Sequence, residues 1–196
     1  MAVASALPPV EATRRHLNVR QAQTVQRVID AARDELREVG FDDLTVRSVA
    51  SRAGVATATA YTYFSSKSHL LAEILWRMLN ARDRIESTLP NPGARVAAVF
   101  TDLSRFLAAD PELARAATTA LLDPDPDVAQ LRWLIAAEIN SRIVRAAGPQ
   151  ATADVVDALG IAWSGAMLQA GMGHTDYTQM GERLVAVTRL ILGGDQ

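Results

Sequence analysis

The stretch that decides the fold is TVRSVASRAGVATATAYTYFSSK, residues 45–67. Its valines and alanines recur at helical spacing on both sides of Gly54, without the alternation that is typical of a strand. Two short helices joined by such a turn form a helix-turn-helix, whose second helix enters the major groove of DNA. The stretch therefore predicts a DNA-reading element in a helical protein.

The same stretch concentrates residue types that the rest of the chain uses sparingly. Two of the three tyrosines, Tyr61 and Tyr63, lie here, and the chain's only lysine, Lys67, follows them. Hydroxyl and ammonium groups donate hydrogen bonds to phosphate oxygens, so we expect Tyr63 and Lys67 to contact the DNA backbone. Tyr61 either packs in the core or contacts DNA.

Small hydroxyl side chains make up the polar face of the second helix. Thr57, Thr59 and Thr62 can bond base edges or phosphates, and their methyl groups can meet a thymine methyl. Thr45 is predicted to cap the first helix by accepting a free amide of its first turn. Arg47 is either a solvated side chain or a further DNA contact.

This ordered set of residues resembles the TetR family of transcriptional regulators over about residues 22–71. The resemblance implies a homodimeric repressor that binds double-stranded DNA at a palindromic operator and leaves it when a small molecule binds. The residues that match the family's pattern are Gly40, Phe41, Thr45, Val46, Val49, Ala50, Ala53, Gly54, Val55, Thr59, Tyr61, Tyr63, Phe64, Ser66, Lys67 and Leu70.

Three residues depart from that pattern. Ala56 stands where the family has a serine that opens the recognition helix, so a cap worth about 1 kcal/mol is lost. Ala58 stands in place of a glycine and adds a methyl group where the backbone approaches DNA, and Ala60 replaces a leucine in the core. The motif stays intact, but the operator sequence does not follow from it.

Helical periodicity continues through the rest of the chain, so we predict an all-α fold of about nine helices. We expect a flexible basic arm at 1–20, a helix-turn-helix domain at 21–67 and a helical ligand-binding and dimerisation domain at 68–196. A helix from Ser66 to about Leu89 would join the domains, with PNPG at 90–93 as a hinge. Small residues in the last two helices, about 155–172 and 180–192, predict a homodimer interface there.

The chain's net charge is −2, and its distribution is uneven. Residues 1–67 carry a net charge of +2, and residues 68–196 carry −4. Arg14, Arg15 and Arg20 lie in a segment without acidic residues, which suits phosphate or minor-groove contacts but equally a solvated tail. The first twenty residues lack the charge order of a signal peptide.

Several classes of protein are disfavoured by what the chain lacks. It has no cysteine, which excludes disulfides and thiolate metal sites, and its three histidines are widely spaced, so we predict no metal and no cofactor. No apolar run is long enough for a membrane span, and a cytoplasmic location fits. Nucleotide-binding, GxSxG and zinc motifs are missing, so we predict no enzyme. A helical enzyme with accessory helices and an interaction module without DNA binding are the alternatives.

Large side chains in the C-terminal half predict a pocket for a small apolar effector. The alternative for each of them is plain core packing, and Trp133, which falls off the apolar stripe, either lines the pocket or faces solvent. This half also resembles TetR-type repressors of sterol and lipid breakdown, which implies an apolar ligand. The candidate pocket residues are Trp76, Phe100, Phe106, Trp133, Asn140, Trp163 and Met167.

Overall fold

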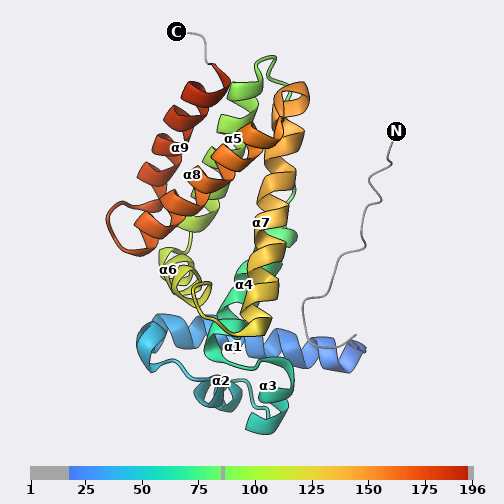
Figure 1. The fold of residues 1–196 in the computed structure, drawn as a ribbon. Coiled ribbons are helices and arrows are strands. Elements are labelled where there is room, and N and C mark those ends of the chain that lie inside the picture. The colour runs from blue at the N-terminus through green and yellow to red at the C-terminus, as the bar shows by residue number, and fades with distance from the viewer. Residues whose placement is uncertain (1–17, 85–86, 194–196) are drawn as a thin grey trace.

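A computed structural model describes residues 18–84 and 87–193 of the chain. These residues form nine α-helices and one 3₁₀ turn without a strand among them, which confirms the predicted all-α fold (Figure 1). The helices are α1 (Val19–Asp43), α2 (Val46–Arg52), α3 (Thr57–Tyr63), α4 (Lys67–Asn80), α5 (Pro92–Ala108), α6 (Pro111–Ala120), α7 (Pro126–Ala147), α8 (Ala153–Gly171) and α9 (Tyr177–Leu192).

Helices α1, α2 and α3 lie at one end of the molecule, where α1 crosses below the larger bundle (Figure 1). The regular part of α1 stops at Gly40, whose φ of 76° is in the left-handed region that glycine adopts without strain. The core of this end is completed by later helices, because Val28 of α1, Leu70 of α4 and Leu113 of α6 belong to one buried cluster. The expected boundary between residues 67 and 68 therefore crosses a continuous core.

Helix α4 is shorter than the sequence predicts. It ends at Asn80, whereas the apolar spacing predicts a helix to about Leu89. The carbonyls at a helix end need new partners, and Arg142 of α7 supplies them by donating from Nη2 to the oxygens of Leu79 (3.0 Å) and Arg82 (3.3 Å). A long-range contact thus replaces the next turn of the helix.

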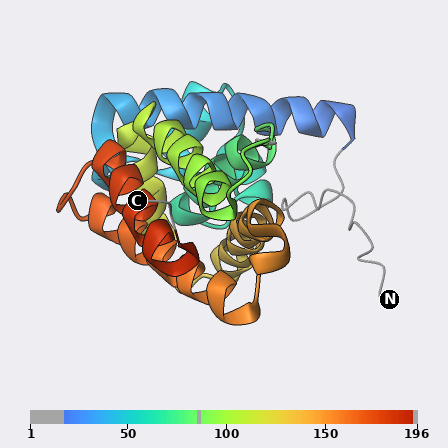
Figure 2. The same cartoon turned by 90° about the horizontal axis from the view of Figure 1, so that it is seen from above.

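Helix α5 is the centre of the larger bundle. Seen from above, it lies inside the ring of other helices, with α8 and α9 on one side and α7 on another (Figure 2). Its residue Phe100 is fully buried and stacks on Trp163 of α8, with ring centroids 5.9 Å apart. Within the described ranges, no helix is both long and apolar enough to cross a bilayer.

Three helices of the bundle begin in the same way. Asn91, Asp110 and Asp125 are the N-caps of α5, α6 and α7, and a proline follows each of them. An Asn or Asp side chain accepts a free amide of the first turn, and proline is well tolerated where no helical amide partner exists. The sequences that look like breakers are therefore helix starts.

The small residues of α8 and α9 serve two different purposes. A Cβ on Gly171 would lie 2.6 Å from Thr118 of α6, and one on Gly181 would lie 2.8 Å from Ser104 of α5. These two glycines allow close packing within one chain. At Gly165, by contrast, a Cβ would meet no atom within 4 Å. Only part of the small-residue pattern is thus available to a partner.

Candidate DNA-binding site

The two short helices α2 and α3 are held together by a small apolar core. Val46 and Ala50 of α2 pack with Ala60 of α3, and Val55 in the turn covers them. Gly54, at the turn, has a φ of 64°, which an L side chain rarely adopts. The turn and this core fix α3 at the outer end of the molecule (Figure 1).

The cap predicted at Thr45 is present, and α4 begins with a similar one. The hydroxyl oxygen of Thr45 accepts the amide of Ser48 at 3.0 Å, and Ser66 caps α4 by accepting the amide of His69. Ala56, the N-cap of α3, makes no side-chain hydrogen bond. The recognition helix therefore lacks one stabilising interaction, as the alanine predicts.

The outward face of α3 is formed by Ala58, Tyr61 and Thr62, and Thr57 and Thr59 lie beside it. Thr57 and Thr59 are half-buried, Thr62 is exposed and Tyr61 is 46% exposed. The hydroxyl of Thr62 donates to the carbonyl of Ala58 at 3.0 Å, so its oxygen remains able to accept a hydrogen bond. This face offers small hydroxyl groups beside one aromatic ring.

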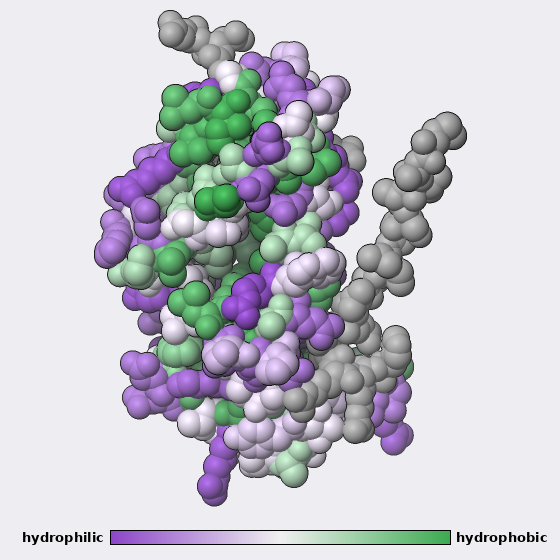
Figure 3. All heavy atoms as spheres, in the orientation of Figure 1, coloured by the Kyte–Doolittle hydropathy of each residue, from purple (hydrophilic) through white to green (hydrophobic). Residues whose placement is uncertain are grey.

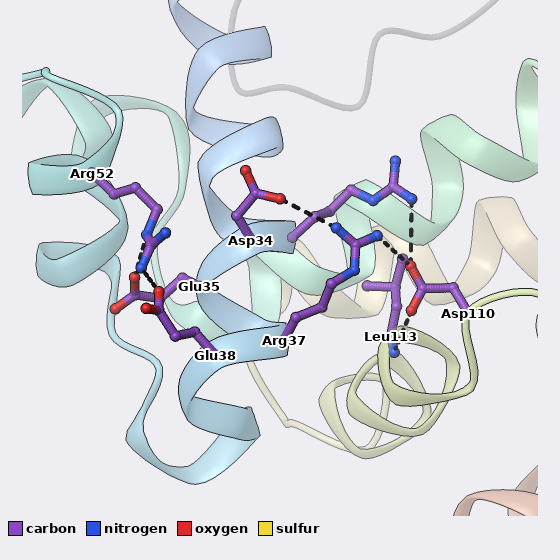
Figure 4. A network of polar contacts seen from close by, with 8 residues as sticks. Asp34, Glu35, Arg37, Glu38, Arg52, Asp110 and Leu113 are labelled. Atoms are coloured by element: carbon purple, nitrogen blue, oxygen red, sulfur yellow. Dashed lines mark hydrogen bonds and ion pairs between the residues drawn. The ribbon is translucent and has the colours of Figure 1, made fainter.

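Arg47 is exposed on α2, and no hydrogen bond or ion pair occupies its guanidinium among the residues that the structure describes. The arginine in the last turn of the same helix differs, because Nε of Arg52 lies 2.6 Å from Oε2 of Glu35 and the group also pairs with Glu38 (Figure 4). Arg52 therefore holds α2 against α1. Arg47 is the arginine of α2 that remains available to a phosphate.

The expectation that Tyr63 extends toward phosphates is wrong, since this residue is only 5% exposed. Tyr63 lies three residues after the buried Ala60 and therefore shares its inward face of α3. Its ring joins the cluster that contains Leu44 and Leu71. The tyrosine that faces outward is Tyr61.

Lys67 is engaged within the chain. Its ammonium group donates to the carbonyls of Phe41 (2.9 Å) and Asp42 (3.0 Å) and lies 4.5 Å from the centre of the Phe41 ring. These carbonyls follow the break at Gly40 and need a donor. An ammonium group has three donors, so one is left for a phosphate.

The predicted arm is only partly described. Arg14 and Arg15 lie outside the described residues. Arg20 is exposed in the first turn of α1, which begins at Val19 with Asn18 as its cap, so it belongs to the helix and not to an arm that reaches residue 20.

The N-cap of α6 joins the bundle to α1. Oδ2 of Asp110 lies 3.1 Å from Nη2 of Arg37 and 3.4 Å from Nη2 of Arg33, while its Oδ1 accepts the amide of Leu113 (Figure 4). The carboxylate that starts α6 thus also contacts two arginines of α1.

The N-cap of α7 makes a second joint, to the turn between α3 and α4. Oδ2 of Asp125 accepts the hydroxyls of Ser65 (2.9 Å) and Ser66 (3.0 Å). Burial alone raises the pKa of Asp125, but the amide of Asp127 and the two hydroxyls outweigh it and hold that pKa below its usual value. His69, 1% exposed, packs its ring edge against Phe64 beside this joint.

We expect Asp125→Ala to lower the free energy of unfolding by about 1–2 kcal/mol, because it removes a helix cap and two hydrogen bonds at a partly solvated site. Asp125→Asn keeps a capping oxygen and should lose less than half as much. Urea titration of both variants measures the difference. Equal losses would mean that the carboxylate charge, and not the cap, stabilises the joint.

The seven predicted pocket residues do not form one site. Trp76 and Phe100 pack in the core, and Trp133 is 67% exposed because it points away from the inward stripe of α7. Asn140, which is exposed, borders an open groove of about 500 Å³ between α7 and α8, part of the hollowed face in Figure 3. The remaining three, Phe106, Trp163 and Met167, line a small apolar cavity of about 10 Å³, and Trp163 borders the groove as well.

A different pocket, of about 220 Å³, lies between α5, α7 and residues that follow α4, and the sequence did not predict it. Its charged lining residues are Arg84, Arg95, Asp102, Arg142 and Arg145. They come from three segments that are far apart in the chain, so no local spacing groups them.

Known proteins resemble this chain both in sequence and in fold. Residues 28–74 match the family described as "Bacterial regulatory proteins, tetR family". An HTH-type transcriptional regulator of Mycobacterium tuberculosis (strain ATCC 25618 / H37Rv) is 45% identical over 190 residues, which cover 95% of this chain and 88% of that protein. The transcriptional repressor KstR of the same strain is 29% identical over 181 residues, 88% of this chain and 82% of KstR.

Solved structures share the fold at lower sequence identity. A TetR transcriptional regulator from Rhodococcus sp. RHA1 superposes with a TM-score of 0.70 at 22% identity, covering 90% of this chain and all of that one. Thermus thermophilus FadR, a TetR family repressor solved in complex with lauroyl-CoA, has a TM-score of 0.64 at 18% identity, covering 88% and 96%.

Proposed function

Because the chain belongs to the TetR family of transcriptional regulators, we propose that it is a homodimeric repressor that binds a palindromic operator and is released by a small molecule. Like its relatives, it is a transcriptional regulator and not an enzyme. The observation that carries the proposal is the outward face of α3, where hydroxyl groups stand on a helix that a small core holds at the end of the molecule.

The DNA contacts that we propose divide into two kinds. Thr57, Thr59 and Thr62 of α3 read base edges, because their short side chains allow the helix backbone to approach the groove. Arg47, Tyr61 and the remaining donor of Lys67 contact phosphates, which position the helix without reading sequence. We include Thr45, the N-cap of α2, among the phosphate contacts. Arg20 of α1, and Arg14 and Arg15 earlier in the chain, contribute positive charge that attracts the DNA backbone.

We place the dimer interface on the outward faces of α8 and α9. Ile161 and Leu168 of α8 are 67% and 36% exposed, Met172 at its C-cap is 55% exposed, and Leu190 of α9 is 86% exposed. Apolar atoms gather over the C-terminal part of α9 on the face shown in Figure 3. Two such helix pairs across a two-fold axis form a four-helix interface. The axis would set two recognition helices about 34 Å apart, one turn of DNA.

Repression and ligand release are supported by the relatives. KstR is named a repressor, and FadR of Thermus thermophilus was solved with lauroyl-CoA. In this chain, a ligand acts only if it binds the DNA-free arrangement better than the DNA-bound one. The joints at Asp110 and Asp125 are where a movement of the bundle reaches α1 and α4. We propose that the protein acts in the cytoplasm, on an operator in its own genome.

Selection of bound duplexes from a random pool, with the full chain, tests the proposal directly. We expect enrichment of a palindrome whose half-sites are centred about one helical turn apart. Recovery of no preferred sequence, together with binding of protein partners, would favour an interaction module without DNA binding.

We expect Arg47→Ala to weaken binding to every duplex by a similar factor and to reduce the slope of log K against log salt by about one. The reason is the loss of one phosphate contact, which releases one counterion fewer. Operator titrations at several salt concentrations between roughly 50 and 200 mM measure this slope. Arg105→Ala, an exposed arginine on α5, is the matched control and should leave the slope unchanged.

A further inference from the structure

The arginine-lined pocket has an excess of positive charge. Two of its lining arginines share one carboxylate, because Oε1 of Glu138 accepts Nε of Arg84 at 3.0 Å and Nε of Arg142 at 2.8 Å. One carboxylate thus faces two guanidinium groups. Arg142 itself is 5% exposed, so this positive charge lies well below the surface.

The outer wall adds two more cations. Asp102, the carboxylate among the pocket's lining residues, already pairs with Arg82, whose Nε lies 3.0 Å from its Oδ2. Arg95 and Arg145 line the pocket as well, and within the described ranges neither forms an ion pair with a carboxylate. Counted over the described residues, three positive charges around one small pocket are therefore uncompensated, which favours the entry of an anion.

Two of these guanidinium groups, those of Arg95 and Arg142, are held in place by hydrogen bonds within the chain before any ligand arrives. Arg95 donates from Nε to the carbonyl of Ala146 (2.8 Å) and from Nη1 to those of Leu89 (2.8 Å) and Pro90 (2.9 Å). Arg142 is fixed by the carbonyls at the end of α4. Donors that are already oriented bind with a smaller loss of entropy.

The apolar cavity lies on the next turns of the same two helices. The polar pocket uses Asp102 of α5 and Arg142 of α7, and the cavity uses Phe106 of α5 and Ile139 of α7. These positions are three or four residues apart, or about 4.5–6 Å along a helix. Arg82 marks the border, since its guanidinium pairs with Asp102 and lies 5.3 Å from the Phe106 ring centre.

We propose that the arginine-lined pocket binds the anionic head, a carboxylate or a phosphate, of an amphiphilic effector whose hydrocarbon tail enters the adjoining cavity. The cavity holds only about 10 Å³, so the tail must displace side chains, of which the unbranched Met167 is the most adaptable. The inference rests on the proposed function only in naming this ligand as the effector. An anion at Arg142 would act on the end of α4 directly, through the bonds to Leu79 and Arg82.

Three probes with one tail and different heads test the proposal on the full chain: dodecanoate, dodecyl phosphate and dodecanol. Calorimetry should show that at least one of the two anions binds at least about tenfold more tightly than dodecanol. The reason is that charge-assisted hydrogen bonds are stronger than those between neutral groups. The tighter anion identifies the head group. Trp163, which lines the cavity, should report the tail through a change in its fluorescence.

A pair of matched arginine variants locates the site. Arg145→Gln should weaken binding of the preferred anion about tenfold and leave dodecanol binding unchanged, since Arg145 has no partner in the described chain whose loss would unfold it. Arg105→Gln, on the exposed side of α5, should change neither.

Equal binding of the alcohol and the anions, no binding by any probe, or an unchanged affinity in Arg145→Gln would each overturn the proposal. No operator enters these measurements. A failure here therefore leaves the DNA-reading proposal standing, and a failure to find an operator leaves a positive binding result intact.

Discussion

Glu138→Ala will lower the free energy of unfolding by about 3–5 kcal/mol. The carboxylate is 7% exposed and is shared by Arg84 and Arg142. Its removal leaves the guanidinium of Arg142, which is buried, without a compensating charge, and the desolvation cost of that cation is then no longer offset. Urea unfolding at several protein concentrations measures the loss and separates it from any change in dimerisation.

Two further variants identify the cause of that loss. The double variant Glu138→Leu with Arg142→Met removes both buried charges and should recover part of the stability, because an apolar pair needs no charge compensation. The recovery stays incomplete, since the carbonyls of Leu79 and Arg82 lose the hydrogen bonds from Arg142. Asp102→Ala removes a carboxylate from a more solvated pair with Arg82 and should lose about 1 kcal/mol or less. A loss below 1 kcal/mol in Glu138→Ala would contradict the reasoning.

The same carboxylate makes stability depend on pH in the acid range. Burial alone raises the pKa of Glu138, but the hydrogen bonds from Arg84 and Arg142 outweigh it and hold that pKa below the ordinary value of 4.5. A group with a depressed folded pKa contributes its full stability above the unfolded value and loses it as pH falls through the folded one. The wild type should therefore lose stability below about pH 4.5 more steeply than Glu138→Gln.

Gly165→Glu will convert the proposed dimer to a monomer and reduce affinity for the proposed operator by about 10²- to 10⁴-fold, the gain that joining two binding modules commonly provides. A Cβ at this glycine meets no atom within 4 Å in one chain, and its neighbours on the outward stripe of α8, Ile161 and Leu168, are exposed. Across a two-fold axis the new carboxylate would face its own copy in an apolar interface.

The design separates assembly from folding. Glutamate has a higher helix propensity than glycine, by roughly 0.5–1 kcal/mol in a helix interior. The monomeric variant should therefore remain helical, as measured by circular dichroism. Sedimentation gives the assembly state, and titration of a selected operator gives the affinity. Ala137→Glu, on the exposed side of α7, is the matched control. A Gly165→Glu protein that stays dimeric would move the interface away from this face of α8.

Local features of the DNA-binding end could be predicted because each depends on a few adjacent residues. The cap at Thr45, the turn at Gly54 and the missing cap at Ala56 all follow from hydrogen bonds and backbone angles within one turn of chain. The starts of α5, α6 and α7 are equally local, because each depends on a capping Asn or Asp followed by a proline.

The two tyrosines show where this kind of prediction ends. Tyr61 and Tyr63 are two residues apart on a seven-residue helix, and either can face the core if the helix turns about its axis. Contacts with α1 and α4 decide that Tyr63 is inside. Lys67 was equally ambiguous, since the carbonyls that it contacts lie 25 and 26 residues earlier in the chain.

The sequence alone determined the helical fold, the helix-turn-helix and the TetR family, because helix period, caps and motif spacing are properties of neighbouring residues. Only the tertiary structure decided which tyrosine faces outward, where α4 ends, and that four arginines between residues 84 and 145 share a pocket. The physical reason is range: a cap acts across one turn, whereas the orientation of a side chain and the compensation of a buried charge depend on whichever distant segment packs against it.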